Sequence, residues 1–177
     1  KYRKTYKTAY IKPLARAGAE YVLNFVNEEA IMNKIRTVIE VESPIEENCL
    51  IDKIAAAFCV PKTAKKAIAQ ISRYVSSYEA QRQEYFGKVF YVDKPVSTFR
   101  PSDARVTRDL TKVHPHEIVA AAKCAIEATV YIEKDDLNKE VFKLFNVAKR
   151  TKSAVEWVDA SLTAAVQTVE IIVTPHG

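Results

Sequence analysis

Hydrophobic residues recur every three or four positions through most of the chain, which is the period of an amphipathic helix. In the first half, the segments with this period are 20–41, 47–58 and 62–78. Asn27 stands ahead of Glu28 and Glu29, an arrangement typical of a capped helix start, so we expect a break in the first helix near residue 27. After a polar stretch, the apolar and aromatic run 85–92 predicts a β-hairpin or a single strand.

The same pattern returns in the second half at a constant offset of 87 residues. Residues that keep both identity and offset are Ile45, Glu46, Leu50, Phe58, Val60, Lys62, Lys65 and Ala67, which recur as Ile132, Glu133, Leu137, Phe145, Val147, Lys149, Lys152 and Ala154. A repeat of this length without a gap indicates one supersecondary unit present twice. It predicts helices over 116–129, 135–145 and 149–163, and a final strand over 169–173.

Short turns at 59–61 and 146–148 each join two of these helices. The order helix, extended contact, helix, tight turn, helix and β-ribbon is typical of a winged helix. We therefore predict a mainly α fold with small β-wings (α+β), built as two tandem winged-helix or helix-turn-helix units. The predicted parts are a basic linker and N-terminal helix over 1–27, unit 1 over 28–93, a Pro/Arg linker over 94–114 and unit 2 over 115–177.

Two interpretations fit the start of the helix near residue 47. Ser43, Pro44 and Glu46 match a capping box, with Ser43 as the N-cap and Pro44 in the first helical position. Alternatively, Ile45 forms one rung of a strand and the helix begins at Glu47.

Composition narrows the class of protein. With 48% hydrophobic and 28% charged residues, the 177-residue chain is typical of a soluble globular protein, and its 3 glycines argue against an all-β sandwich. Cys49, Cys59 and Cys124 form no CxxC pair, so we predict buried thiols rather than disulfides or a zinc knuckle. No stretch is apolar enough for a membrane span and no signal peptide is visible, so we expect a cytoplasmic protein with no membrane partner.

The net charge of +5 favours an anionic partner, and the helix after the first turn carries four cations and no acid. The side chains expected to contact nucleic acid, from this helix and the following ribbon, are Lys62, Thr63, Lys65, Lys66, Gln70, Arg73 and Lys88. The second helix of a helix-turn-helix enters the major groove with its N-terminal half. Lysines suit phosphates, whereas Thr63 and Gln70 are able to reach base edges. Alternatively, the lysines only solvate a helix face.

Further basic residues form a secondary group. These candidates for additional phosphate contacts are Arg100, Arg105, Lys149, Arg150 and Lys152. In unit 2, Glu156 and Asp159 follow on the same helix and would repel a nucleic-acid backbone, which favours a packing or protein-contact role for that unit. Trp157 between them is either a core residue or an interface anchor.

The segment 1–18 is basic and contains no acidic residue. Tyr2, Tyr6 and Tyr10 interleave with its cations at a helical spacing. This segment is either a solvated linker or an accessory arm, in which cations contact phosphates and tyrosine rings stack on bases.

No catalytic constellation is visible in the sequence. His114, His116 and His176 lie in no ligand-like pattern with cysteines or acids, so we predict no metal site. The chain contains neither GxxxxGK[ST] nor GxGxxG, the loops that bind nucleotide phosphates. We expect no cofactor and no enzyme activity in this segment.

Two motifs carry a resemblance to a known family. The run 38–46, with Glu42-Ser43-Pro44-Ile45-Glu46 where the family usually has Glu-Gly-Pro-Ile-His, and the run 114–118 after a Pro/Arg segment resemble a bacterial domain. This is the uncharacterised C-terminal domain of superfamily-1 helicase-like proteins, which often follows an endonuclease-like domain, and the resemblance covers about residues 30–177. It implies that the ATPase and nuclease centres lie upstream, in a parent chain that is an ATP-dependent helicase.

Two functions follow as expectations. The first is a non-catalytic accessory module that binds duplex or forked DNA through the phosphate backbone, mainly with unit 1. The second is a protein-interaction module that docks on the parent's helicase and nuclease domains or pairs with a second copy. The acids of unit 2 and an open edge at strand 169–173 favour the second function.

Overall fold

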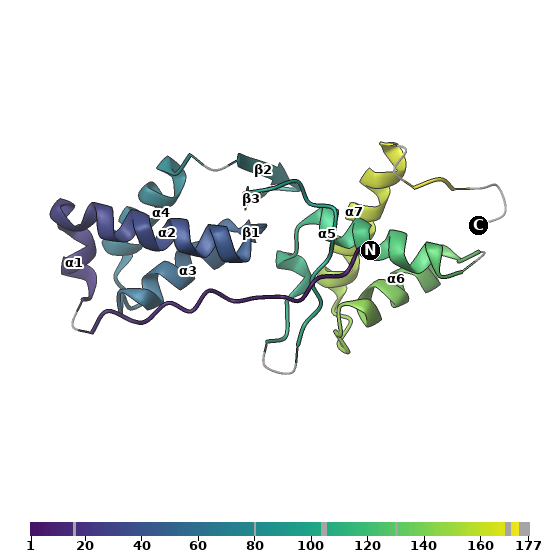
Figure 1. Cartoon of the computed structure of the whole chain (residues 1–177), viewed down its shortest axis with the longest axis horizontal. Coiled ribbons are helices and arrows are strands. Elements are labelled where there is room, and N and C mark those ends of the chain that lie inside the picture. Colours follow the sequence, from purple (N-terminus) through teal and green to yellow (C-terminus); the bar gives the residue numbers. More distant parts are fainter. Residues whose placement is uncertain (16, 80, 104–105, 130, 169–170, 174–177) are drawn as a thin grey trace. The chain divides into compact units, whose positions relative to one another are not determined.

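The computed structural model describes residues 1–15, 17–79, 81–103, 106–129, 131–168 and 171–173. The chain forms two compact units. The N-terminal unit is Lys7–Lys94, and the C-terminal unit is Pro95–Gly177 together with Lys1–Tyr6. Both are built mainly of helices, and the N-terminal unit adds a three-stranded antiparallel sheet, so the fold is α+β (Figure 1).

The N-terminal unit follows the predicted order of helices and strands. Its elements are α1 (Ala19–Leu23), the 3₁₀ turn η1 (Phe25–Asn27), α2 (Glu28–Glu42), β1 (Ile45–Glu46), α3 (Glu47–Ala57), α4 (Lys65–Ser77), β2 (Gln81–Tyr85) and β3 (Lys88–Val92). The break near residue 27 is confirmed, but Asn27 does not cap α2 with its side chain. Its amide donates to the Tyr21 carbonyl at 2.9 Å, which joins α1 to the start of α2.

The core of this unit lies where α2, α3 and α4 turn their apolar faces toward one another. Fully buried residues at the helical period include Ile31, Ile35, Val38, Leu50, Ile54, Phe58, Ile71 and Val75. The sheet has the order β1-β3-β2, and Ile45 pairs with Tyr91. The hairpin turn uses Phe86 (φ 50°) and Gly87 (φ 77°), the left-handed pair that a tight two-residue turn requires.

The second interpretation of the region before α3 is correct. Ile45–Glu46 is a short strand and α3 begins at Glu47. Glu46 is the N-cap, because its carboxylate accepts the Cys49 N–H at 3.1 Å. The capping box is wrong: the Ser43 hydroxyl instead accepts the Asp93 N–H at 2.6 Å, which ties the start of β1 to the end of β3.

The 87-residue repeat is confirmed helix by helix. In the C-terminal unit the helices are α5 (Pro115–Glu127), α6 (Lys134–Leu144) and α7 (Lys152–Gln167), preceded by the 3₁₀ turn η2 (Leu110–Lys112). Helices α5, α6 and α7 begin 87 residues after α2, α3 and α4, and α6 ends 87 residues after α3. The apolar positions therefore specify the same helices in both copies.

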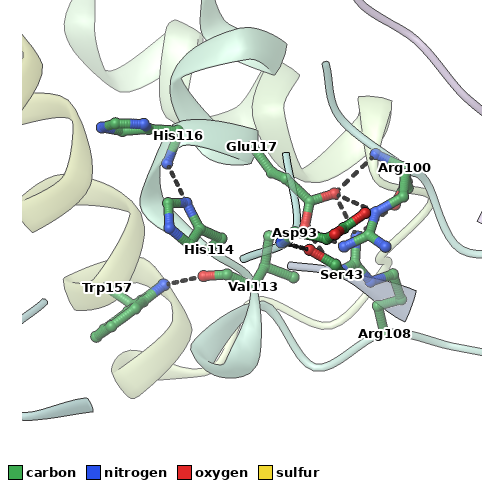
Figure 2. Close-up of polar contacts among 9 residues, drawn as sticks. All are labelled: Ser43, Asp93, Arg100, Arg108, Val113, His114, His116, Glu117 and Trp157. Carbon is green, nitrogen blue, oxygen red and sulfur yellow. Dashed lines mark hydrogen bonds and ion pairs between the residues drawn. The ribbon is translucent and has the colours of Figure 1, made fainter. Parts of the chain in front are cut away.

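Residues 94–114 are not a linker. Phe99, Leu110 and Val113 are buried in the C-terminal unit, and Phe99 forms a parallel bridge with Arg3. Trp157 is also buried and its indole N–H donates to the Val113 carbonyl at 2.9 Å, so of its two interpretations the core role is correct (Figure 2).

Three smaller expectations differ from the structure. Ile171–Val173 is not a strand, and residues 169–170 of the predicted final strand lie outside the described residues. Cys59 is exposed, since it occupies the turn after α3 with φ 54°, whereas Cys49 and Cys124 are partly buried. Of the helices in the described ranges, none has both the length and the apolar character to cross a membrane.

Candidate nucleic-acid interface

Helix α4 separates its apolar and cationic residues onto two faces. Ala67, Ile71 and Val75 are buried against the core of the N-terminal unit. Lys65, Lys66 and Arg73 are exposed on the other face, as predicted. Because no acidic residue lies between Asp52 and Glu79, this face carries only positive charge.

At the start of α4, few side chains compensate the free backbone N–H groups and the positive end of the helix dipole. The helix begins at Lys65, so Lys62 and Thr63 lie in the preceding turn rather than on the helix. Ala64 occupies the N-cap and supplies no side-chain hydrogen bond, and the first turn contains no acid. The positive end of the helix dipole and the nearby lysine charges therefore act on the same surface, which favours an anion.

Interactions within this surface are few and weak. Lys62 Nζ lies 3.9 Å from the Asp52 carboxylate, and both side chains are exposed. Lys65 and Lys66 form no ion pair with any residue that the structure describes. Both lysines are therefore available to an external phosphate.

Gln70 and Arg73 act together rather than separately. Arg73 donates to the Gln70 side-chain oxygen at 3.4 Å, so this oxygen is already used on the exposed face. Lys88 lies at the start of β3 in the hairpin and is partly buried. The cluster that the structure brings together around α4 is therefore Lys62, Thr63, Lys65, Lys66, Gln70 and Arg73.

Arg82 is a hairpin residue that the sequence analysis did not include. It is exposed on β2, its guanidinium lies 5.9 Å from the centre of the Tyr91 ring, and it pairs with Glu47 at 3.7 Å. The same Glu47 accepts the Tyr91 hydroxyl at 3.0 Å. Burial first, and then this hydrogen bond, raise the pKa of Tyr91 to about 12.

The basic residues of α7 and the preceding turn are more neutralised. Lys152 lies 3.9 Å from Glu156 one turn later in the helix. Arg150 donates to Asn138 at 3.3 Å and covers the Phe142 ring at 5.5 Å. Lys149 is exposed, but the surface around it lacks the continuous positive charge of α4.

Arg100 does not lie on an accessible basic surface, contrary to the expectation. It is buried and donates to the Glu117 carboxylate through Nε at 2.9 Å and a terminal nitrogen at 2.8 Å. Arg108 donates to the same carboxylate through both terminal nitrogens at 3.0 Å (Figure 2). Arg100 therefore has a structural role, and Arg105 lies outside the described residues.

The environment of Glu117 keeps it ionised inside the C-terminal unit. Burial alone would raise the pKa of this carboxyl, but the Arg108 and Arg100 guanidiniums outweigh it and lower the pKa to about 2. Tyr6 covers both cations, with its ring centre 4.5 Å from the Arg108 guanidinium and 5.3 Å from that of Arg100.

His114 is buried beside this cluster. Burial, followed by the charge of His116, lowers the pKa of His114 to about 3. Its Nδ1 accepts the His116 N–H at 3.1 Å, which caps α5 and requires the neutral ring (Figure 2). Within the described ranges, no group of three His, Cys, Asp or Glu residues is placed to hold a metal ion.

The N-terminal tyrosines do not form the helical face that their spacing indicates. Residues 1–14 have no helix. Tyr2 donates to Glu127, Tyr6 covers the buried arginines, and Tyr10 is exposed. The Ala9 N–H donates to the buried Glu42 carboxylate at 2.8 Å, so this segment packs on the protein instead of forming a free arm.

A scan of protein-family models, a search of curated proteins and a search of solved structures each gave no match. The function is therefore argued from the geometry of the site.

Proposed function

We propose that this chain is a non-catalytic nucleic-acid-binding module whose N-terminal unit is a winged helix with α4 as its recognition helix. The order α2, β1, α3, α4, β2, β3 and the sheet order β1-β3-β2 support a winged helix. In this arrangement the sheet covers the core, and the polar face of α4 stays open to a ligand.

The single observation that carries the proposal is the charge of α4. Its exposed face has lysines and an arginine but no acid, and they surround an uncapped helix start. Phosphates are recognised by lysines and by helix N-termini, so this surface suits a nucleic-acid backbone. Because lysine does not discriminate strongly between bases, we expect salt-sensitive binding with weak sequence preference.

The β2–β3 hairpin provides the second contact. Arg82 and Lys88 place two more cations on the ribbon that follows α4. The resemblance to the C-terminal domain of helicase-like proteins favours duplex or forked DNA, with upstream helicase and nuclease domains as partners.

The experiment compares charge reversal on α4 with charge reversal on its equivalent in the other copy. Fluorescence anisotropy is measured with duplex, forked and single-stranded DNA from ~50 mM to ~200 mM salt. The triple variant Lys62→Glu, Lys65→Glu and Lys66→Glu should abolish binding at all salt concentrations. A matched variant, Lys149→Glu and Lys152→Glu, uses two of the equivalent positions in the C-terminal unit and should retain most of the affinity.

Each outcome bears on the proposal. Neutralising one phosphate-binding lysine should lower the slope of log K against log salt by about one. Absence of binding by the wild-type chain at ~50 mM salt, or equal loss in both variants, contradicts the proposal. Circular dichroism on both variants verifies that they remain folded.

A further inference from the structure

An apolar groove of about 400 Å³ opens on the C-terminal unit, between the end of α5, the start of α6 and the end of α7. The apolar residues from these helices and the segments beside them include Ile126, Ile132, Leu137, Leu162 and Val166. Lys134 is the only charged residue in the described lining. Tyr131, at the same groove, is 53% exposed and adds an aromatic ring to this apolar surface.

The internal repeat shows what covers the same surface in the N-terminal unit. The position 87 residues before Val166 is the exposed Glu79. The positions before the other four residues are Ile39, Ile45, Leu50 and Val75. All four are buried there in the cluster that includes Tyr91 of β3. Strand β3 thus closes the N-terminal groove, and it does so by pairing with Ile45–Glu46.

The C-terminal unit has the first part of this arrangement but not the strand. Glu133 has the extended backbone of its equivalent Glu46, with φ/ψ of −70°/152° against −71°/140°. In the part of the chain that the structure describes, no strand pairs with Ile132–Glu133. Ile126 and Ile132 are only partly buried, whereas their equivalents Ile39 and Ile45 are buried.

The chain's own last described residues do not take the place of β3. The Ile171 N–H donates to the Ala165 carbonyl at 3.4 Å, which holds the segment beside α7. Ile172 and Val173 line the groove but remain 79% and 60% exposed. The groove therefore keeps apolar surface that an added strand would bury.

The charge at the rim indicates the chemistry of the missing strand. In the N-terminal unit Glu47 receives the Tyr91 hydroxyl and the Arg82 guanidinium. The equivalent residue is Lys134, which is exposed and has the opposite charge. An acidic side chain on the incoming strand would thus pair with Lys134, whereas the β2 edge of a second copy would bring Arg82 toward it.

We propose that the C-terminal unit accepts an extended strand of a partner protein, which pairs antiparallel with Ile132–Glu133, buries alternate apolar side chains in the groove and places a carboxylate at Lys134. Backbone hydrogen bonds to the edge supply affinity and the side-chain pockets supply specificity, as in other strand-addition complexes. The residues of this surface belong to the C-terminal unit, whereas α4 belongs to the N-terminal unit, so the two proposals are tested with separate variants.

The probe is a synthetic peptide copied from Gly87–Asp93, the segment that contains β3. Because Glu47 accepts the Tyr91 hydroxyl, position 91 of the peptide is the one that meets Lys134. Two versions, Tyr91→Glu and Tyr91→Lys, are titrated into the full chain up to ~1 mM and followed by amide chemical shifts. The acidic peptide should bind about fivefold tighter, the effect of one rim ion pair.

Variants of the chain locate the site. Lys134→Glu should reverse the preference, because the lysine peptide then carries the complementary charge. Val166→Lys should abolish binding of both peptides, whereas Gln167→Lys, the exposed neighbour outside the lining, should leave it unchanged.

Several results overturn the proposal. The proposal is wrong if the peptides cause no saturable chemical-shift changes, if the changes lie far from Ile132–Glu133, or if the two peptides bind with equal affinity. It is also wrong if a second copy of the chain already closes the groove. Sedimentation of the wild type as a dimer that Val166→Lys dissociates would reveal the last case.

Discussion

Cys59 and Asn146, 87 residues apart, have the same left-handed backbone, with φ of 54° and 55°. Each follows α3 or its equivalent α6, and in each turn the next N–H returns to the preceding helix. Val60 donates to Ala55 at 2.8 Å, and Val147 donates to Phe142 at 3.0 Å. The turn is therefore repeated bond for bond, although its sequence changes.

Replacing these two residues by glycine should have different effects. Cys59→Gly should raise the free energy of unfolding by about 1 kcal/mol, because a residue with a Cβ is strained in this conformation. Asn146→Gly should not stabilise, because Asn tolerates the conformation and its amide donates to the Ser102 carbonyl at 2.8 Å. Urea denaturation followed by circular dichroism measures both, and equal effects would contradict the difference.

Among the buried charges of the C-terminal unit, Glu117 should be the one whose removal lowers the free energy of unfolding most. Glu117→Gln leaves two buried guanidiniums without their carboxylate and should cost about 3–5 kcal/mol. The exposed Glu127→Gln on the same helix is the control and should cost less than about 1 kcal/mol. Trp157 is the only tryptophan and is buried in this unit, so its fluorescence during urea unfolding reports the change.

The coupling between these groups can be tested directly. Arg108→Leu should destabilise the wild type strongly, but it should cost less in the Glu117→Gln background, because the ion pair is already lost. Additive free energies would show that Arg108 and Glu117 do not interact.

His114 should make stability fall as the solution becomes acidic. The pKa of His114 is lowered from 6.5 to about 3 in the folded chain, so below pH 6.5 the unfolded state binds a proton that the folded state excludes. Between pH 7 and pH 5 this should cost about 2 kcal/mol. Glu117 adds its own loss only below its ordinary pKa of 4.5, as pH falls toward its folded pKa of about 2.

The variant His114→Asn separates this effect from the rest of the chain. Asn caps a helix with its side-chain oxygen and does not titrate, so the loss between pH 7 and pH 5 should nearly vanish. Trp157 fluorescence during urea unfolding at both pH values measures it, with His116→Asn as the control that keeps His114. An unchanged pH dependence in His114→Asn would assign the effect to another group.

Removing the indole N–H should weaken the start of α5. Trp157→Phe keeps the aromatic ring in the core but leaves the Val113 carbonyl without its donor at 2.9 Å. The expected loss is about 1–3 kcal/mol, the cost of a buried unpaired acceptor. Because this variant lacks tryptophan, circular dichroism is the appropriate measurement, and an unchanged midpoint would contradict the role of this bond.

The helices were predictable because apolar spacing alone determines them. Helices α2, α3 and α4 recur as α5, α6 and α7 even where the amino acids differ between the two copies, because burial requires only an aliphatic side chain at each core position. Strand β2 was missed because Gln81–Tyr85 is largely polar and its place depends on pairing with β3.

The roles of several charged residues were not predictable from local sequence. Arg100 was predicted to contact phosphate, and the segment that contains Arg108 was predicted to be a linker, because their carboxylate partner, Glu117, lies within an apolar helix farther along the chain. A lone acid directly before the apolar run Ile118–Ala122 was the available signal, since a buried acid requires a cationic partner. The basic face of α4 was predictable because its lysines face solvent and depend on no distant partner.

The ring of Tyr6 over two arginines has a consequence for how the chain matures. The C-terminal unit takes this ring from the first six residues, while the whole N-terminal unit is encoded between them and Pro95. During synthesis, Tyr6 emerges long before the two arginines that it covers. All residues of the N-terminal unit are also synthesised before these arginines. The N-terminal unit can therefore fold before the C-terminal unit has all of its residues. A fragment that starts at Pro95 would lack Tyr6 and would expose the face of the two arginines that this ring covers.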